Sequence, residues 1–525
     1  MSSVLSMTPT ELHTFLYGVG LGVAVAAVSS TLLFSLPRAV VSSQSQAPKK
    51  SPRKRSALKR GASAAANAVE VAEEANAETV ARLRGMFSLP ADRLQQIVKQ
   101  ILVDMKKGLE KDGAANIKML PTHVTRRPSG KEKGTYLALD LGGTNFRVCE
   151  IILDGAGGST MHQSKFVIDE AAKTGDGTAL FDFIADCVKA FLGEYHKDQD
   201  VEAVKWKLGF TFSFPVDQWT INSGSLLIWT KGFTATNVVG KDVVALLKSA
   251  FERKNLNIDV TALVNDTTGT LMSLAYSKPD TYVGVILGTG SNCAYVEKIE
   301  NVIKYKGPRE GVKEMLINME WGGFDDDMVV IPRNKYDLKL DRESANPGSY
   351  TFEQLISGMY LGEIVRLVLV DLVKTGELFS YSAGGSPELR TKYAFETAYM
   401  SRIERDYSYQ LMETKTILEE HLNIPETTLA DRKLVKAICE MVGLRSARLA
   451  AAGVAAVVTK INKLGAPGVT VGIDGSLFLL YPHYQNRMRD ALREIVGISA
   501  ENILLEKSQD GSGTGAALIA CLAGK

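Results

Sequence analysis

Apolar and polar positions change their spacing along the chain, and this pattern predicts helices first and then strands alternating with helices. Residues 79–111 place apolar side chains three and four positions apart, as at Leu94, Ile97, Val98 and Ile101, which is typical of amphipathic helices. Short apolar runs predict strands at 136–141, 146–153, 204–212, 260–266, 282–288, 292–299, 469–476 and 501–507. Helical periodicity predicts helices at 179–195, 241–255, 352–374, 431–463 and 484–497. We therefore expect an α/β fold with a mixed sheet in each half.

The N-terminal region contains an uncharged apolar run of 22 residues, 15–36. As a helix rising about 1.5 Å per residue, this run would cover the hydrocarbon core of a bilayer. Residues 38–60 hold eight Lys or Arg and no acidic residue, which favours a cytosolic orientation for the rest of the chain. We expect a membrane anchor at 1–37 and a basic, flexible tether at 38–77. A cleaved signal sequence and an organelle transit peptide are the alternatives.

Composition excludes several classes of protein. The chain has 525 residues, 45% hydrophobic and 23% charged, which is not the composition of a wholly disordered or polytopic membrane protein. The five cysteines form no CxxC pair and the six histidines no HExxH motif, so neither disulfides nor a metal centre of these residues is indicated. The formal charge is +2, and without the eight basic residues of 38–60 it is −6, so the globular part has no reason to bind nucleic acid.

Two units of strand, glycine loop and strand resemble each other and are candidates for holding phosphate. Asp140 ends the first strand and is followed by GGTN at 142–145, and the second loop is GTGSN at 288–292. Glycines lack Cβ atoms, so backbone N–H groups and a threonine hydroxyl can face an anion. A single loop of this kind is more often a simple hairpin turn. Two matching loops favour a nucleotide held between duplicated lobes, with Asp140 holding a water of Mg²⁺.

Two further glycine clusters follow predicted strands, VGIDGS at 471–476 and DGSGTG at 510–515. The second precedes the apolar segment AALIACLA, which predicts a helix. Glycines at a helix N-terminus favour contact with a nucleotide. Neither cluster has the sequence GxxxxGK[ST], so a P-loop is excluded.

A set of polar side chains lies at the ends of apolar segments. Asp266 follows a predicted strand and precedes a helix, where it is either a helix N-cap or a general base. Glu353 is either an ordinary helix residue or part of a site. The set consists of Ser213, Thr230, Lys231, Asn265, Asp266, Glu320 and Glu353. Amides and carboxylates of this kind suit a polyol, because each hydroxyl both donates and accepts hydrogen bonds.

The motifs occur in an order that resembles hexokinases over residues 78–524: LDLGGTNFRV, LGFTFSFPV, WTKGF, LVNDTTGTL, GTGSN, NMEWG, SGMYLGE, RSARLAAAG, VGIDGS and DGSGTGAAL. The resemblance implies an actin-like ATPase fold, with two ribonuclease-H-like lobes and a cleft that holds ATP and Mg²⁺. It implies transfer of the γ-phosphoryl group to the C6 hydroxyl of a hexose, glucose before fructose or mannose, as in glycolysis. It also implies a small-lobe part at 78–278 and a large-lobe part at 279–525, whose last helix returns towards the small lobe.

The resemblance further implies roles for individual residues. Asp266 would accept the C6 hydroxyl proton, and Lys231 would be a cation near the sugar and the transferred phosphoryl group. The sugar would be bound by Ser213, Phe214, Thr230, Lys231, Asn265, Asp266, Asn292, Glu320 and Glu353. ATP would be bound by Asp140, Leu141, Gly142, Gly143, Thr144, Asn145, Thr289, Gly358, Met359, Leu444, Arg448, Ser512, Gly513, Thr514, Gly515 and Ala516. Asp140 would reach Mg²⁺ through water.

Several positions depart from the family pattern near these sites, namely Cys293, 322–327 and 443–444. They leave open an N-acetylglucosamine kinase of hexokinase type. A catalytically silent, membrane-tethered sugar sensor is the alternative from another class. An N-terminal apolar anchor also resembles that of hexokinases on the mitochondrial surface. We therefore expect the mitochondrial outer membrane as the location, with the endoplasmic reticulum membrane or the cytosol as alternatives.

Overall fold

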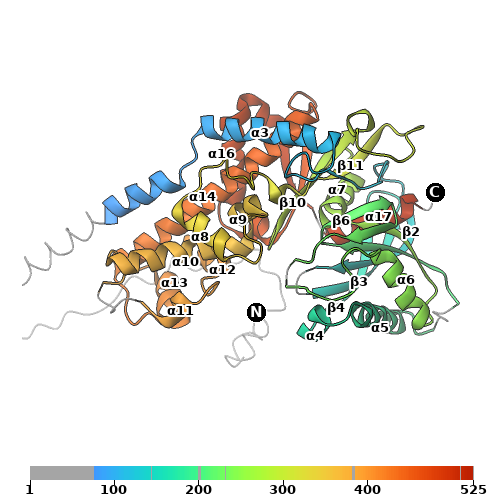
Figure 1. The fold of residues 1–525 in the computed structure, drawn as a ribbon, viewed down its shortest axis with the longest axis horizontal. Coiled ribbons are helices and arrows are strands. Elements are labelled where there is room, and N and C mark those ends of the chain that lie inside the picture. The colour runs from blue at the N-terminus through green and yellow to red at the C-terminus, as the bar shows by residue number, and fades with distance from the viewer. Residues whose placement is uncertain are drawn as a thin grey trace, which may run out of the picture. The chain divides into compact units, whose positions relative to one another are not determined.

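The computed structural model describes residues 76–142, 145–198, 203–230, 232–380, 385–508 and 510–523. The chain separates into two units, 1–67 and 68–525, and the described residues all belong to the second. The predicted anchor lies outside the described residues, as does the tether except for its last two positions. Everything that follows concerns the second unit (Figure 1).

The first sheet has the strand order β4-β3-β2-β5-β8. Its strands are β2 (Lys133–Leu141), β3 (Asn145–Asp154), β4 (Ser159–Val167), β5 (Trp206–Phe212) and β8 (Ile258–Val264). Strands β2, β3 and β4 pair antiparallel, whereas β5 and β8 run parallel to β2. Alternate residues of β2 face opposite sides, so Leu137 and Leu139 pack with helices α5 (Gly177–Tyr195) and α6 (Val243–Arg253). Ala138 packs with α17 (Gly511–Ala523) on the other side.

The second sheet has the order β1-β11-β10-β9-β12-β13 and repeats this topology. Its strands are β1 (Leu120–Pro121), β9 (Thr281–Leu287), β10 (Ser291–Lys298), β11 (Glu314–Asn318), β12 (Val469–Asp474) and β13 (Ile503–Lys507). Strands β9, β10 and β11 pair antiparallel, and β12 and β13 run parallel to β9. The predicted mixed sheet in each half is confirmed.

Helices α7 (Asp266–Ser277) and α17 lie side by side, and they connect the two sheets (Figure 1). Helix α17 contacts β2 and β5, and α7 contacts β9. Close approach requires glycine here, since a Cβ on Gly284 of β9 would lie 2.5 Å from the carbonyl oxygen of Thr267. The C-terminal helix therefore packs on the first sheet, although it is far from that sheet in sequence.

The larger hydrophobic core lies around the second sheet and is mostly helical. Its helices include α3 (Ala91–Glu110), α8 (Lys335–Glu343), α9 (Thr351–Ile356), α10 (Gly358–Thr375), α12 (Thr397–Glu404), α14 (Leu429–Lys460) and α16 (Tyr484–Val496). Among the described helices, α14 is the one long and apolar enough to cross a membrane, and most of it is buried in this core. Helix α3 packs in the same core, which differs from its expected place in the small-lobe part.

The single helix predicted at 352–374 is wrong, because the chain breaks at Ser357 between α9 and α10. Ser357 has an extended backbone, and the N–H groups of Gly358 and Met359 turn away to donate to the carbonyls of Gly288 and Thr289. A tertiary contact therefore ends the helix where apolar periodicity alone continues.

Other elements gave weak sequence signals. Edge strand β4 is mostly exposed on both faces, so it lacks an apolar run. The other elements missing from the prediction are too short to show a periodic pattern, namely α4 (Glu170–Thr174), β6 (Val216–Thr220), β7 (Ser223–Leu226), α11 (Pro387–Arg390), α13 (Met412–Thr416) and α15 (Ser476–Leu480).

Candidate active site

A cavity of about 480 Å³, the phosphate cavity, brings together residues from both glycine loops and both sheets. It is lined by Asp140, Gly142, Arg147, Ser213, Asp266, Thr270, Ile286, Thr289, Gly290, Met359, Asp474, Gly475 and Ser512. Most of these follow the carboxyl ends of parallel strands, where ligands of open α/β sheets bind. Helices α7 and α17 begin beside it, with Asp266 and Ser512 in their first turns, and helix N-termini favour anions.

Asp266 is the first residue of α7 and faces the phosphate cavity. The N-cap is its neighbour Asn265, whose Oδ1 accepts from the backbone N–H of Thr267 at 3.0 Å. Asp266 Oδ1 accepts from the same N–H at 2.8 Å. Because Asn265 fills the capping position, the N-cap alternative for Asp266 fails. The carboxylate lies on the cavity wall, where it can accept a proton.

Asp140 is held by a side chain that the sequence did not single out, Arg147. The Arg147 guanidinium donates to Asp140 Oδ2 at 2.6 Å and to Asp510 Oδ1 at 2.7 Å. The Ser512 hydroxyl donates to the same Oδ2 at 2.8 Å. Burial lowers the pKa of Arg147, but the two carboxylates more than reverse this effect, so it stays charged. Among the described residues no donor contacts Asp140 Oδ1, which is the oxygen left for a ligand water.

The phosphate cavity carries an excess of carboxylates. Burial raises the pKa of Asp474, and repulsion from Asp510 and Asp266 raises it further. In the part of the chain that the structure describes, no three His, Cys, Asp or Glu converge as a metal cage. Mg²⁺ usually keeps several water ligands in proteins. The separate carboxylates of the phosphate cavity therefore fit a Mg²⁺ ion held mainly by water and phosphate oxygens.

The second glycine loop is held from behind by the break between α9 and α10. Gly358 N–H donates to the Gly288 carbonyl at 2.7 Å, and Met359 N–H donates to the Thr289 carbonyl at 3.1 Å. A Cβ on Gly358 would lie 2.9 Å from that Gly288 oxygen, so glycine is required at this contact. Gly358 thus supports the loop, while Thr289 and Met359 line the phosphate cavity.

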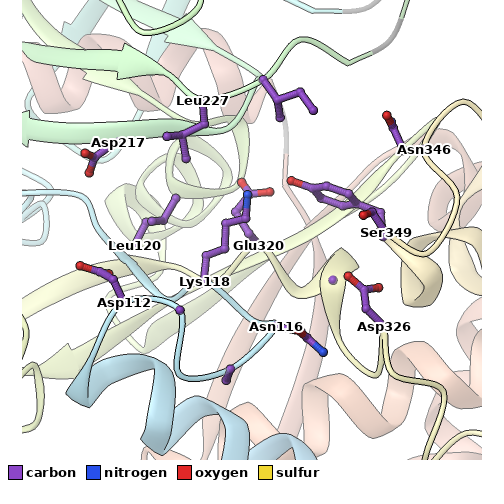
Figure 2. A pocket seen from close by; sticks show the side chains of 15 residues that line it. Asp112, Asn116, Lys118, Leu120, Asp217, Leu227, Glu320, Asp326, Asn346 and Ser349 are labelled. Carbon is purple, nitrogen blue, oxygen red and sulfur yellow. The ribbon is translucent and has the colours of Figure 1, made fainter.

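A second cavity of about 650 Å³, the sugar cavity, contains Glu320 (Figure 2). It is lined by Asp112, Gly113, Ala115, Asn116, Lys118, Leu120, Asp217, Leu227, Ile228, Glu320, Gly323, Asp326, Asn346, Ser349 and Tyr350. The amides of Asn292 and Asn318 donate to Glu320 Oε1 at 3.1 and 2.9 Å. These bonds hold the buried Glu320 carboxylate in place. The Glu320 backbone is left-handed, with φ 52°.

Glu353 is not an ordinary exposed helix residue. Its Oε2 accepts from the backbone N–H of Ser291 at 2.8 Å, next to Asn292. The Ser291 hydroxyl accepts from Trp321 Nε1 at 3.0 Å. The start of β10 therefore joins the segments that carry Glu320 and Glu353.

The other predicted sugar residues do not line the sugar cavity or lie outside the described residues. Ser213 lines the phosphate cavity, whereas Asn265 and Phe214 line a small gap of about 20 Å³ between Phe212 and Asn318. Phe214 also packs edge-on against Trp229 at 4.8 Å. Thr230 lines none of these spaces within the described ranges. Lys231, Gly143 and Thr144 lie outside the described residues, as does the side chain of Asn145.

Two of the predicted nucleotide contacts need correction. Leu141 is fully buried in the core beneath α5, since strand alternation points it away from the side of Asp140. Arg448 donates to Glu494 at 2.5 Å and to the Leu89 carbonyl at 3.0 Å, so its guanidinium joins α14 to α16 and to the segment before α3. Leu444 is exposed on α14 and lines neither cavity among the described residues, so its nucleotide contact stays a prediction.

A further correction concerns the glycines of α17. A Cβ on Gly515 would lie 2.2 Å from the Gly269 carbonyl oxygen, and one on Gly511 would lie 2.6 Å from Thr270 Cα. These glycines let α17 cross α7 closely. Gly513, Thr514 and Ala516 are buried with them, so of this predicted cluster only Ser512 reaches the phosphate cavity.

Arg147, Asp474, Asn318 and Gly475 are site residues absent from the predicted set. Asp474 and Gly475 lie in the VGIDGS motif, whose strand-end aspartate was an available signal. Arg147 and Asn318 sit within strands, and they also lie in the motifs LDLGGTNFRV and NMEWG, so the motif context was the available signal for them.

Comparison with known proteins shows similarity to one family over most of the chain. Two family models described as hexokinase match residues 79–276 and 282–522. Hexokinase-1 of Schizosaccharomyces pombe is 41% identical over 450 residues, covering 84% of this chain and 90% of that protein. The hexokinase of Kluyveromyces lactis is 42% identical over 457 residues, covering 85% and 92%. The structure of a hexokinase from Schistosoma mansoni complexed with glucose has a TM-score of 0.79 and 37% identity, covering 86% of this chain and 99% of that one.

Duplicated mixed sheets, paired glycine loops and a shared cavity define a sugar kinase with the actin-like ATPase fold. Within this class, the chain belongs to the hexokinase family. Its reaction is the ATP-dependent phosphorylation of a hexose, a step of glycolysis.

Proposed function

We propose that Asp266 is the general base that accepts the proton from the C6 hydroxyl of the hexose. The observation that carries this proposal is the phosphate cavity, where Asp266 lies together with both glycine loops. A base must be within hydrogen-bond reach of the proton it takes and next to the group that is transferred. Asp266 meets both conditions for a hexose that spans from Ser213 to Glu320 of the sugar cavity.

The remaining residues position the reactants. Phosphoryl transfer needs mainly alignment and charge stabilisation. Backbone N–H groups near Thr289 and Gly142 hold phosphate oxygens, and Arg147 keeps Asp140 oriented towards the phosphate cavity. Asp140 would hold Mg²⁺ through a water, and the ion would supply positive charge against the phosphate oxygens of ATP. Lys231 adds a cation on the sugar side, as the family resemblance implies.

Glucose is the proposed main substrate. Glu320 and Glu353 offer carboxylate acceptors to sugar hydroxyls, and Asn292 and Asn318 orient Glu320. A deoxy sugar leaves a buried partner unpaired, which lowers affinity. Rates compared across glucose, fructose, mannose and N-acetylglucosamine test the preference, and a higher kcat/KM for N-acetylglucosamine than for glucose would overturn it.

A coupled assay of ADP production on the full chain tests the base. We expect Asp266→Asn to lower kcat by about 10²-fold or more, the usual contribution of general base catalysis. Asp169→Asn is the matched control, because Asp169 caps α4 at an exposed helix start, where Asn caps equally well. Equal rates for the parent and Asp266→Asn would remove Asp266 as base. An absent rate in the parent would favour the silent sensor.

We also propose that residues 15–36 anchor the enzyme to the mitochondrial outer membrane with the kinase in the cytosol. The proposal rests on the uncharged apolar run and the basic segment after it. Residues 1–60 fused to a fluorescent protein should remain in the membrane after carbonate extraction and co-localise with mitochondria. A soluble or lumenal fusion product would refute the anchor, and reticular fluorescence would refute the location alone.

A further inference from the structure

The two glutamates of the sugar site reach it from different segments. Glu320 precedes the turn at 321–323, and Glu353 lies on α9. The start of β10 contacts both, through Asn292 to Glu320 and Ser291 to Glu353. The distance between the two carboxylates therefore depends on how α9 is held against the loop at 320–327.

Helix α9 has no capping side chain of its own. It has six residues, and its N-cap, Tyr350, is left-handed at φ 57° and makes no side-chain capping bond to any described residue. So short a helix has little stability alone, and its first N–H groups need acceptors. Tertiary contacts must supply them.

Asp326 supplies that acceptor from the loop that follows Glu320. Its Oδ1 accepts from the Thr351 backbone N–H at 2.9 Å and from the Thr351 hydroxyl at 3.1 Å. The backbone N–H of Tyr350 is a further donor to this carboxyl group. Asp326 therefore caps α9 from outside, and its negative charge at the helix start adds a favourable interaction with the helix dipole.

The Asp326 side chain lies where it can link α9 to the loop that follows Glu320. Asp326 lines the sugar cavity with Glu320, and Figure 2 shows it on the wall below Ser349. It is only five residues after the turn that begins at Trp321. A displacement of the Asp326 contact would therefore move α9, and Glu353 with it, relative to Glu320.

We infer that Asp326 is a positioning residue for hexose binding, because it caps α9 from the Glu320 loop and so sets the spacing of Glu320 and Glu353. This inference rests on the proposed sugar contacts of the two glutamates. Asp326 touches neither ATP nor the base in this arrangement. Its loss is therefore expected to weaken sugar binding while chemistry and ATP binding remain.

The charge state of Asp326 provides a separate readout. Burial raises its pKa to about 6, although the bonds from Thr351 lower it. The charged and titratable groups around it come from several elements: Arg333 before α8, Tyr350 and Glu353 of the α9 segment, Asp325 and Asp327 on its own loop, and Glu320 and Lys118 in the cavity. As the pH falls through this pKa, the cap becomes neutral and its hydrogen bonds weaken.

Steady-state kinetics of the full chain, with glucose and ATP varied separately, tests the inference. We expect Asp326→Ala to raise the KM for glucose about tenfold and Asp326→Asn about threefold, in line with the loss of a helix cap. Thr351→Val keeps shape but removes a hydroxyl that also lies 3.1 Å from the Asp325 carbonyl oxygen and from the Arg333 guanidinium, so it should raise the KM for glucose at least as much as Asp326→Asn. For all three, kcat and the KM for ATP should stay within about twofold of the parent, since α9 carries no proposed ATP contact.

Asp169→Asn is the matched control. Asp169 also caps a short helix with its carboxylate, accepting from the Ala172 backbone N–H at 2.7 Å, but at the exposed start of α4 and not at α9. It should leave the KM for glucose unchanged. In the parent, the KM for glucose should rise between pH 7 and pH 5.5, and in Asp326→Asn this rise should be flattened.

Three results would overturn the inference. The first is an unchanged KM for glucose in Asp326→Asn and Thr351→Val. The second is a parallel loss of kcat and ATP affinity with a lowered thermal midpoint, which indicates general damage. The third is an unchanged pH profile in Asp326→Asn. Glu320→Gln and Glu353→Gln are measured beside them, because normal glucose affinity in both would refute the sugar site itself.

Discussion

Gly515→Ala separates helix packing from nucleotide contact at the C-terminal glycine cluster. A Cβ at this position would lie 2.2 Å from the carbonyl oxygen of Gly269 and 2.3 Å from its Cα. Both are backbone atoms, so no side-chain rotation can relieve the overlap. To reach an ordinary contact of about 3.5 Å, α17 and α7 must separate by more than about 1 Å.

The size of the effect follows from two opposing terms. Overpacking against backbone costs about 3 kcal/mol, the upper end of the usual range. Replacing glycine by alanine inside a helix stabilises the helix by about 1 kcal/mol. The net loss in the free energy of unfolding is therefore about 2 kcal/mol. Because Asp266 is the first residue of α7, the same displacement moves the proposed base and lowers kcat.

Thermal unfolding and kinetics of the same preparation provide the assay. Gly193→Ala is the control, because Gly193 lies in helix α5 and a Cβ added there would have nothing within 4 Å, so alanine should stabilise by up to about 1 kcal/mol. We expect the midpoint to fall in Gly515→Ala and to rise in the control. An unchanged midpoint with a raised KM for ATP in Gly515→Ala would refute the packing argument and restore a nucleotide contact.

Three further outcomes follow from the contacts of individual side chains. Arg147→Met should raise the KM for ATP and lower stability by about 3 kcal/mol, because it leaves two partly buried carboxylates uncompensated; normal ATP affinity would contradict its role. Arg448→Met should lower the thermal midpoint but leave the KM for ATP unchanged, and a selective loss of ATP affinity would reinstate Arg448 as a nucleotide contact. Saturating glucose should change tryptophan fluorescence, since Trp229 and Trp321 adjoin the sugar-binding segments; a spectrum without change would count against this placement.

Much of the fold could be predicted because apolar periodicity is a local property. Strands β2, β3, β9 and β10 match their predicted ranges closely. The break at Ser357 could not be predicted, because its cause is a pair of hydrogen bonds to residues 288 and 289. Edge strand β4 was not predicted, because an exposed strand needs no apolar face and so gives no apolar pattern.

Some residues of the site could likewise be predicted from the sequence, and others could not. Asp266, Asp140, Ser213, Thr289 and Ser512 were identified from motifs, and the structure brings them to one cavity. Glycine motifs were less reliable, because glycine serves phosphate binding and close helix packing equally well in a sequence. Only the crossing of α7 and α17 shows that Gly511 and Gly515 serve packing.

The sequence by itself therefore determined the class of fold, the phosphate loops, the sugar-binding residue types and the family. Each of these depends on residues close together in the chain or on the order of the motifs. Only the tertiary structure decided which charges compensate one another, as in the bridge from Arg147 to Asp140 and Asp510. It also decided that Asp326 caps a helix 25 residues away. Such contacts depend on distances between segments, and spacing along a single chain does not contain them.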